Sequence, residues 1–301
     1  MKLSARNQID LFLLFGGAMM VAAFWLLSAP AASAAGKVNV LYAGSLVNLM
    51  EHGVGPAFDK ASGDTFQGFA GGSSGLANQI KGKLRQGDVF ISASPKVNDG
   101  LMGAANGDWV RWYVTFAQSP LVIGYDASSK FAADFKSKPW YQVLMEPGIK
   151  IGRTDPKLDP KGALTVTLMK AAEAFYNSPG LSEKIIGTPD NPAQVLPEET
   201  LVGRLQSGQL DVGFFYSTET ADAKIPALTL PAEIAPKAVY TATILHNAPN
   251  AAGADAFLVF FLGADGQRIM TEHGLAAQKL TLSGDAGGVP KDVKALLDRA
   301  K

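Results

Sequence analysis

Two short runs of glycine and serine contain the residue types that could hold an anion. The first, Gly71-Gly-Ser-Ser-Gly75, leads into an apolar-periodic segment in which Leu76, Ile80 and Leu84 recur every fourth residue. This pattern predicts a loop and then the start of a helix, with a serine at the N-cap. Glycine lets the backbone approach a bound group closely, and the first amides of a helix have no partner within it. The run therefore indicates an anion cradle.

A second run of this kind, Ala43-Gly-Ser-Leu46, follows a strand-like segment over residues 38–43. A helix is expected to open just after Ser45 and to end near residues 53–56, because apolar residues recur at helical spacing. Two such cradles make a stronger case for anion binding than either would alone.

The next elements repeat this order. Residues 65–70 are predicted to form a strand, the helix after the first run is expected to stop at Gly87, and residues 88–93 suit a strand buried on both faces. Strand and helix in alternation predict a parallel α/β sheet with right-handed crossovers. Ligands of such sheets bind beyond the carboxyl ends of the strands, where Ser45 and Ser74 both fall.

The middle of the chain is expected to form a second domain, entered along the extended residues 109–125. The other predicted elements are a strand at 149–153, a helix at 162–176 with Leu164, Leu168, Ala171 and Phe175 on one face, a helix at 198–206, a strand at 211–216, a returning strand at 238–245, and helices at 252–262 and 265–273.

The N-terminal residues 1–34 have the features of a secretory signal. Lys2 and Arg6 precede an apolar stretch, and Ala32-Ser-Ala34 supplies small residues for cleavage. A retained membrane anchor is the alternative, because about 17 apolar residues lie at the lower edge of a spanning length. The remaining chain is expected to be exported and periplasmic, or attached to the membrane if the segment is not cleaved.

Composition excludes several classes of function. Cysteine is absent, which rules out a disulfide framework and thiolate chemistry. The 27 basic and 27 acidic residues balance without basic runs, which argues against nucleic acid as a partner. His52, His246 and His273 are scattered without ligand spacing, so no cation site is expected.

Three segments together resemble the molybdate/tungstate-binding proteins of ABC importers. They are Tyr42-Ala-Gly-Ser-Leu46, residues 71–80 with 88–94, and residues 205–216. The resemblance implies the type II periplasmic-binding-protein fold, an α/β architecture of two lobes joined by two crossing strands with the ligand in the cleft. The first lobe would comprise residues 35–118 and 239–301, and the second residues 119–238.

The resemblance also implies a set of ligand-binding residues. In the bacterial members, hydroxyls and backbone amides hold the oxyanion. Carried over, Ser45 and Ser74 donate hydroxyls together with the nearby amides of Gly44 and Ser73, and Tyr216 donates its phenol. The loop around Lys161 and the helix start near Glu198 each give a backbone amide.

The archaeal tungstate-type members add an aspartate and a glutamate, which gives six oxygen ligands. The aspartate position matches Asp159, whereas Phe215 is taken to stand in the glutamate's place. A lone carboxylate would repel a dianion, which argues against this mode here.

The expected function is thus an exported, monomeric binding protein that captures molybdate or tungstate and delivers it to an ABC permease, without enzymatic activity or a cofactor. A site made only of donors would reject protonated phosphate, because a proton on the anion meets no acceptor. Phe214 and Phe215 place apolar surface near the site. They leave open the same fold with sulfate or a small organic anion as ligand.

Other roles for these residues are open. Ser45 could cap a helix, and Asp159 with Pro160 fits an N-cap followed by proline at the first helical position. Lys161 and Arg153 could neutralise the anion or form a solvated rim. Tyr216 could lie at the edge of the core with its hydroxyl in water. Gly71-Gly-Ser73-Ser-Gly75 also matches the nucleophile elbow of serine hydrolases, although no segment marks His246 or His273 as the base.

Overall fold

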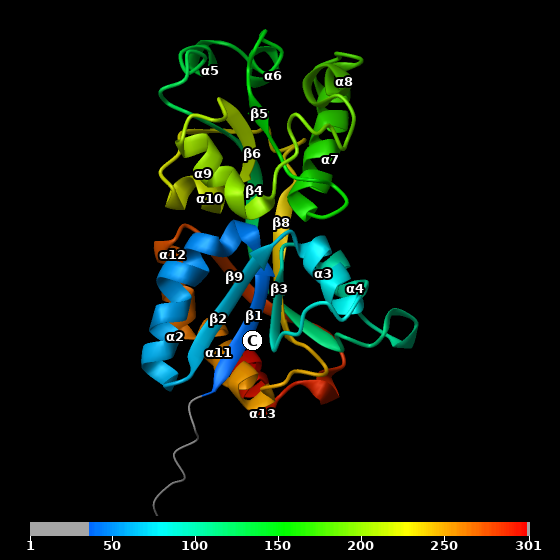
Figure 1. Ribbon diagram of the computed structural model, residues 1–301, viewed down its shortest axis with the longest axis vertical. Helices are drawn as coiled ribbons and strands as arrows, with labels where there is room; N and C mark the ends of the chain where they lie inside the picture. The colour runs from blue at the N-terminus through cyan, green and yellow to red at the C-terminus, as the bar shows by residue number, and fades with distance from the viewer. Residues whose placement is uncertain (1–35, 300–301) are drawn as a thin grey trace, which may run out of the picture. The chain divides into compact units, whose positions relative to one another are not determined.

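The computed structural model describes residues 36–299, and the interpretation of residues 1–34 lies outside them. A parallel sheet is formed by β1 (Lys37–Ala43), β2 (Thr65–Gly71) and β3 (Val89–Ser92), with β1 in the middle and in register with both neighbours. The predicted strand–helix alternation and its parallel pairing are therefore confirmed for this part of the chain (Figure 1).

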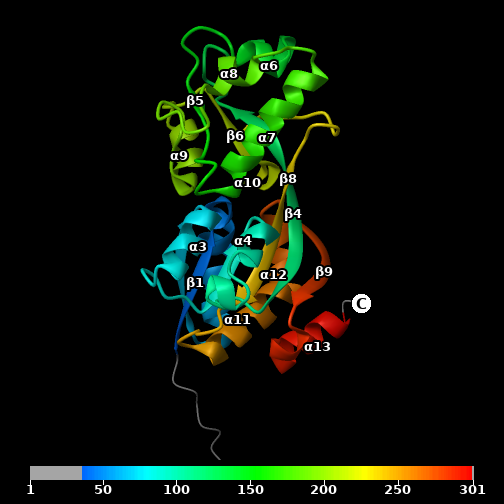
Figure 2. The same ribbon diagram turned by 90° about the vertical axis from the view of Figure 1, so that its right-hand side faces the viewer.

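Two long strands extend this sheet and continue beyond it. β8 (Lys237–Ile244) pairs antiparallel with β3 and with β4 (Trp112–Tyr125), and β9 (Ala276–Gly284) pairs with the other edge of β4. The far half of β4 then pairs with β6 (Val212–Tyr216) and β7 (Ala227–Thr229), and β5 (Ile151–Gly152) lies beside β6. Residues 36–299 thus form two α/β lobes joined by two crossing strands (Figures 1 and 2).

Helices cover both groups of strands. Around the first sheet they are a 3₁₀ turn (Gly44–Leu46), a π-helical segment (Leu49–Val54), α2 (Gly55–Ser62), α3 (Ser73–Lys81), α4 (Pro95–Asp99), a 3₁₀ turn (Ala104–Asn106), α11 (Ala251–Leu262), α12 (Ala264–Glu272), a 3₁₀ turn (Ala286–Gly288) and α13 (Lys291–Arg299). Around the second they are α5 (Asp134–Ser137), α6 (Trp140–Val143), α7 (Pro160–Phe175), α8 (Leu181–Ile186), a 3₁₀ turn (Glu198–Thr200), α9 (Leu201–Gln206) and α10 (Ser217–Asp222).

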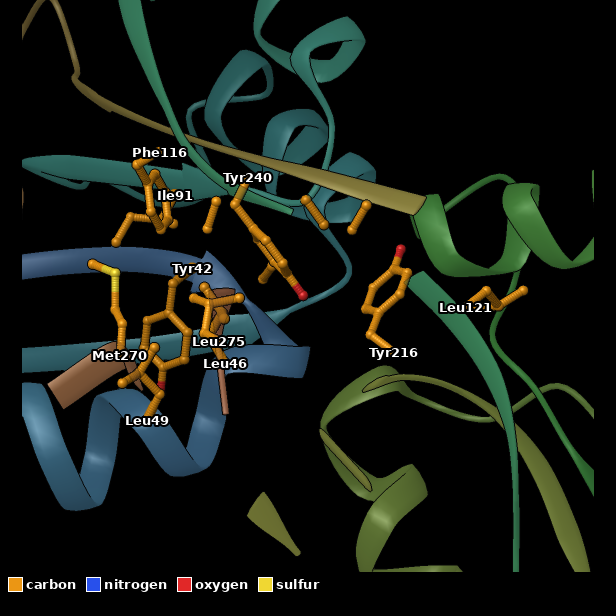
Figure 3. Close-up of a cluster of buried hydrophobic side chains, with 14 of the residues drawn as sticks. Tyr42, Leu46, Leu49, Ile91, Phe116, Leu121, Tyr216, Tyr240, Met270 and Leu275 are labelled. Carbon is orange, nitrogen blue, oxygen red and sulfur yellow. The ribbon is translucent and has the colours of Figure 1, made fainter. Parts of the chain in front are cut away.

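The largest core cluster contains side chains from both lobes. Tyr42, Leu46 and Met270 pack on one side, Tyr216 and Leu121 lie on the other, and Tyr240 lies between them (Figure 3). Within residues 36–299, none of the helices combines the length and the apolar character that crossing a bilayer requires.

Several helix boundaries differ from the predictions. The helix after Ser45 does not end near residues 53–56 but continues through the π-helical segment and α2 to Ser62, where Gly63 adopts a left-handed φ of 78°. α3 ends at Lys81 rather than at Gly87, so that Leu84 is 80% exposed and takes no part in the apolar stripe.

The predicted inner face of α7 is also wrong in part. Leu168 is buried, but Phe175 is 46% exposed, and the other buried positions include Thr165, Met169 and Ala172. The strand β9 and the helix α13 were not predicted. The lobe boundaries at residues 118/119 and 238/239 stay a prediction.

Candidate ligand-binding site

The start of α7 places a lysine inside the protein. Asp159 caps this helix, its Oδ1 accepting hydrogen bonds from the Lys161 amide at 2.9 Å and from Thr154 Oγ1 at 2.8 Å. Pro160 follows at the first helical position, so the predicted cap is confirmed. Because α7 starts in this way, the Lys161 side chain points inward and its backbone amide is already occupied.

The Lys161 ammonium is fully buried and surrounded by carboxylates. Nζ donates to both carboxylate oxygens of Glu219, at 2.8 and 2.9 Å, and lies 3.2 Å from Oε1 of Glu198. Glu219 also accepts the Tyr216 amide at 2.7 Å at the start of α10. The expectation that Lys161 forms a solvated rim is wrong.

Arg153 is fully buried as well, but it has a structural role. Its guanidinium donates to the carbonyls of Thr188 at 2.8 Å and Pro189 at 2.6 Å, and its Nε donates to Gln194 Oε1 at 3.0 Å. These bonds satisfy its donors within one loop. The expectation that Arg153 forms a solvated rim is therefore also wrong.

Glu198 lies against the backbone of the second cradle, at Gly44. A Cβ placed on Gly44 would lie 2.0 Å from Glu198 Oε2, so this approach is possible only because residue 44 is glycine. Although Lys161 is close, neither carboxylate oxygen of Glu198 accepts a hydrogen bond from the described residues. Oε1 has only the ion pair with Lys161, and Oε2 has no partner among the described residues. A buried acceptor left in this way is costly, which marks Glu198 as a candidate for contact with a ligand.

Three hydroxyls line the same region. Ser45 Oγ and Tyr240 OH are 2.9 Å apart, and the Tyr216 ring meets the Tyr240 ring edge to face at 6.1 Å (Figure 3). The Tyr216 hydroxyl is buried and has no hydrogen-bond partner among residues 36–299. The alternative that places this hydroxyl in water is therefore wrong.

The cluster holds three carboxyl groups and one ammonium group. Burial raises the pKa of Glu198 well above its usual range, and the charges of Asp159 and Glu219 add to this shift while Lys161 opposes it. Burial also raises the pKa values of Asp159 and Glu219. Burial by itself would lower the pKa of Lys161, but the charges of Glu219, Glu198 and Asp159 outweigh it and the net shift is upward.

Two cavities flank the cluster, and Glu198 and Glu199 line both of them. One, of about 370 Å³, lies between the end of β2, the start of α3 and the loops around Asp159 and Pro197. The other, of about 250 Å³, extends from Gly44 and Ser45 to Glu219 and the end of α10. The buried cluster is thus reached from two sides.

The first cradle, residues 71–75, lies against the loop before α7. A Cβ on Gly72 would lie 2.5 Å from the Leu158 carbonyl oxygen, and the Gly75 amide donates to that oxygen at 2.8 Å. Ser73 Oγ is buried and accepts from the Ala93 amide at 3.1 Å, whereas Ser74 is half-buried and makes no side-chain hydrogen bond among the described residues.

The residues predicted to bind ligand are thus brought together in part. Gly44, Ser45, Asp159, Lys161, Glu198 and Tyr216 meet in the cluster, while the side chains of Ser73 and Ser74 make no hydrogen bond to it. Neither serine run supplies an N-cap: Ala43 and Gly72 hold those positions without side-chain caps.

Two residues of the cluster were missed. Glu219 accepts the amide of the N-cap residue of α10, as the glutamate of a capping box does, but the N-cap position holds Tyr216 rather than Ser or Thr, so the usual sequence signal is incomplete. No sequence signal marks Tyr240.

Although Phe215 stands at the position taken for the archaeal glutamate, Asp159 is not the only carboxyl group at the site. The Phe215 ring is buried among Val122, Leu201 and Leu205, away from solvent. Glu198 and Glu219 supply two more carboxyl groups. The expectation of a lone carboxylate is therefore wrong.

The geometry does not support the nucleophile elbow. Ser73 Oγ is enclosed, and His273 Nδ1 is bonded to Asp222 Oδ1 at 2.9 Å. Among residues 36–299 there is also no group of three or more His, Cys, Asp and Glu side chains arranged to hold a metal ion.

Comparison with known proteins identifies the family. Residues 38–276 match the model of the bacterial extracellular solute-binding proteins. The chain belongs to this family. An uncharacterized solute-binding protein of Petrotoga mobilis is 31% identical over 238 residues, which cover 68% of this chain and 72% of the relative. The family consists of binding proteins of transporters, and the chain is accordingly not an enzyme and needs no cofactor.

Two further proteins are similar. One is the molybdate/tungstate-binding protein WtpA of Thermococcus kodakarensis, 27% identical over 280 residues, which cover 77% of this chain and 78% of the relative. The other is the solved periplasmic molybdate-binding protein of Azotobacter vinelandii, with a TM-score of 0.62 at 20% identity, covering 79% of this chain and 98% of that one. The second likeness confirms the periplasmic-binding-protein fold.

Replacing Gly44 by alanine tests the packing of Glu198. The added methyl group would overlap the Glu198 carboxylate, so we expect Gly44→Ala to lower the unfolding free energy by about 1–3 kcal/mol. Gly203→Ala on α9 is the matched control, because a Cβ there meets nothing within 4 Å. Urea unfolding measures both. Equal stability of the two variants would show that Glu198 does not lie against Gly44.

The charge cluster predicts how stability depends on pH. A carboxyl whose pKa is raised by folding binds its proton more tightly in the folded state, so stability falls as pH rises from about 4.3 toward the raised value. In the wild type, this one carboxyl should lower the unfolding free energy by up to about 1.4 kcal/mol per pH unit, and we expect Glu198→Gln to abolish this contribution. Unfolding between pH 4.5 and 8 measures it, with the exposed Glu199→Gln as control. The same pH slope in Glu198→Gln and in the wild type would contradict this assignment.

Proposed function

We propose that this protein captures molybdate or tungstate outside the cytoplasm and delivers it to an ABC permease. The name of the Thermococcus relative supports the choice of ligand, and the match covers most of both chains. A putative molybdenum-binding protein of an ABC transporter in Haloferax volcanii, 29% identical over 198 residues, supports the transport role.

One observation carries the choice of an oxyanion. The Tyr216 hydroxyl is buried without an acceptor among the described residues, and its ring lies against Tyr240, which is hydrogen-bonded to Ser45. Leaving such a donor unpaired costs about 1–3 kcal/mol. The oxygens of molybdate and tungstate accept hydrogen bonds, so an anion here would satisfy Tyr216 and add a bond from Ser45.

The charge of the cluster determines how a dianion could enter. With three carboxylates against the single ammonium of Lys161, a dianion would meet net repulsion. If Glu198 holds a proton when the ion binds, its repulsion disappears and it gains an O–H donor. The raised pKa of Glu198 supports this mode.

A second binding mode uses the carboxylates as ligands. The six-oxygen arrangement of the archaeal members requires one aspartate and one glutamate. Here Asp159 accepts the Lys161 amide and Glu198 lies 3.2 Å from Lys161 Nζ. Glu198→Gln separates the two modes. It keeps a hydrogen-bond donor and removes a charged ligand, so affinity is retained in the first mode and lost in the second.

The proposal includes the remaining expectations on location and assembly. Residues 1–34 would direct export and be cleaved, and the monomer would meet the permease in the periplasm. The ligand roles of Gly44, Ser45, Ser73, Ser74, Lys161, Glu198 and Tyr216, and the lobe boundaries, are part of the same proposal.

A small organic anion is the second candidate ligand. The larger cavity is lined by Phe69, Leu76, Leu158 and Leu196 next to Asp159 and Glu198. Such apolar surface suits a carbon-containing group better than a bare oxyanion.

Thermal unfolding with equal concentrations of molybdate, tungstate, sulfate and phosphate tests the proposal. A ligand at about 100 times its dissociation constant adds roughly 2.7 kcal/mol to the stability of the folded state. We expect molybdate and tungstate to stabilise the protein and phosphate not to.

The matched variant is Tyr216→Phe, which keeps the ring and removes the donor. It should weaken molybdate binding by about 10-fold in titration calorimetry, which corresponds to about 1.4 kcal/mol. Stabilisation by carbon-containing anions alone would contradict the proposal and favour the second candidate.

A further inference from the structure

Tyr240 faces the candidate site from one of the strands that connect the two lobes. It lies on β8, is fully buried, and pairs with Ala117 of β4 in the sheet. Its ring packs against Phe116 at 6.1 Å and against Tyr216 at the same distance. These contacts fix the ring, so the position of its hydroxyl is set by the core rather than by a mobile loop.

The Tyr240 hydroxyl has one hydrogen-bond partner among the described residues, Ser45 Oγ at 2.9 Å. The chain separation between the two residues is 195, so this bond ties the turn after β1 to the crossing strand. Ser45 lines the smaller cavity together with Gly44 and Glu198. The pair therefore lies at the edge of the space proposed for the anion.

Either oxygen could be the donor in this hydrogen bond, and the chemistry of the two groups favours Tyr240. A phenol is more acidic than an alcohol and is the better donor, and a serine oxygen can accept while its own hydrogen is donated elsewhere. Burial raises the pKa of Tyr240 well above its usual range, so the phenol keeps its proton. With Tyr240 as donor, the Ser45 hydrogen is free to rotate toward an acceptor in the cavity.

We propose that Tyr240 is a positioning residue: it donates to Ser45 Oγ and thereby directs the Ser45 O–H toward the bound oxyanion. This inference rests on the proposed function, because it assigns the Ser45 hydrogen to that ligand. Tyr240 acts through Ser45 and needs no contact with the anion. Two donors, Ser45 and Tyr216, are then held by aromatic packing on either side of the same ion.

A double-mutant cycle tests the inference, with molybdate as the probe in titration calorimetry. Tyr240→Phe keeps the ring and should weaken binding by roughly 5- to 10-fold, about the effect of one hydrogen bond. Ser45→Ala should weaken binding at least as much. In the Ser45→Ala background, Tyr240→Phe should have no further effect, because the group through which it acts is gone.

Tyr113→Phe is the matched control. It also removes a tyrosine hydroxyl with a 3.0 Å partner, Asp99, but Tyr113 lies at the start of β4 and packs in a different core cluster from Tyr240, so affinity should be unchanged. The unfolding temperature of each ligand-free variant separates loss of stability from loss of binding.

Two results would overturn the inference while the proposed function stands: an unchanged affinity in Tyr240→Phe, or the same fold-change for Tyr240→Phe with and without Ser45. If the wild-type protein bound neither molybdate nor tungstate, the proposed function would fail first, and the inference with it.

Discussion

The site depends on the ion pairs that the buried Lys161 ammonium group forms with Glu219 and Glu198. This ammonium group is the only cation of the cluster among the described residues, and it offsets the charges of Glu219 and Glu198, which start two other helical segments. A buried ion pair adds little net stability, but loss of one partner leaves an uncompensated charge and costs several kcal/mol. The cluster therefore fixes how α7, α10 and the 198–200 turn meet, more than it stabilises the fold.

The crossing strands β4 and β8 hold two tyrosines of the site beside this cluster. Tyr216 ends β6 and pairs with Leu121 of β4, and Tyr240 lies on β8. Tyr240 thus stands on a strand that joins the lobes, Tyr216 on the strand beside β4 and Ser45 in the turn after β1, whereas the charged groups stand at helix starts. A ligand bound by Ser45 on one lobe and by Tyr216 and the charged groups on the other would couple its binding to the relative position of the lobes, as in hinge closure.

The sequence predicted those features of the fold that are determined by residues close together along the chain. The parallel strands β1 to β3, the Asp159–Pro160 cap and the helix beginning at Glu198 follow from local apolar patterns and capping residues. The burial of Lys161 could not be predicted in this way, because its partner Glu219 is 58 residues away and a lysine is normally solvated. For the same reason the Ser45–Tyr240 bond and the pairing of β9 with β4 were out of reach.

A crystal structure of the protein with molybdate, phased at the molybdenum absorption edge, tests the central claim most directly. The account predicts one strong anomalous peak in the buried cluster, with anion oxygens within hydrogen-bond distance of Tyr216 OH and Ser45 Oγ. A peak outside this cluster, or no peak at a saturating concentration, would contradict it.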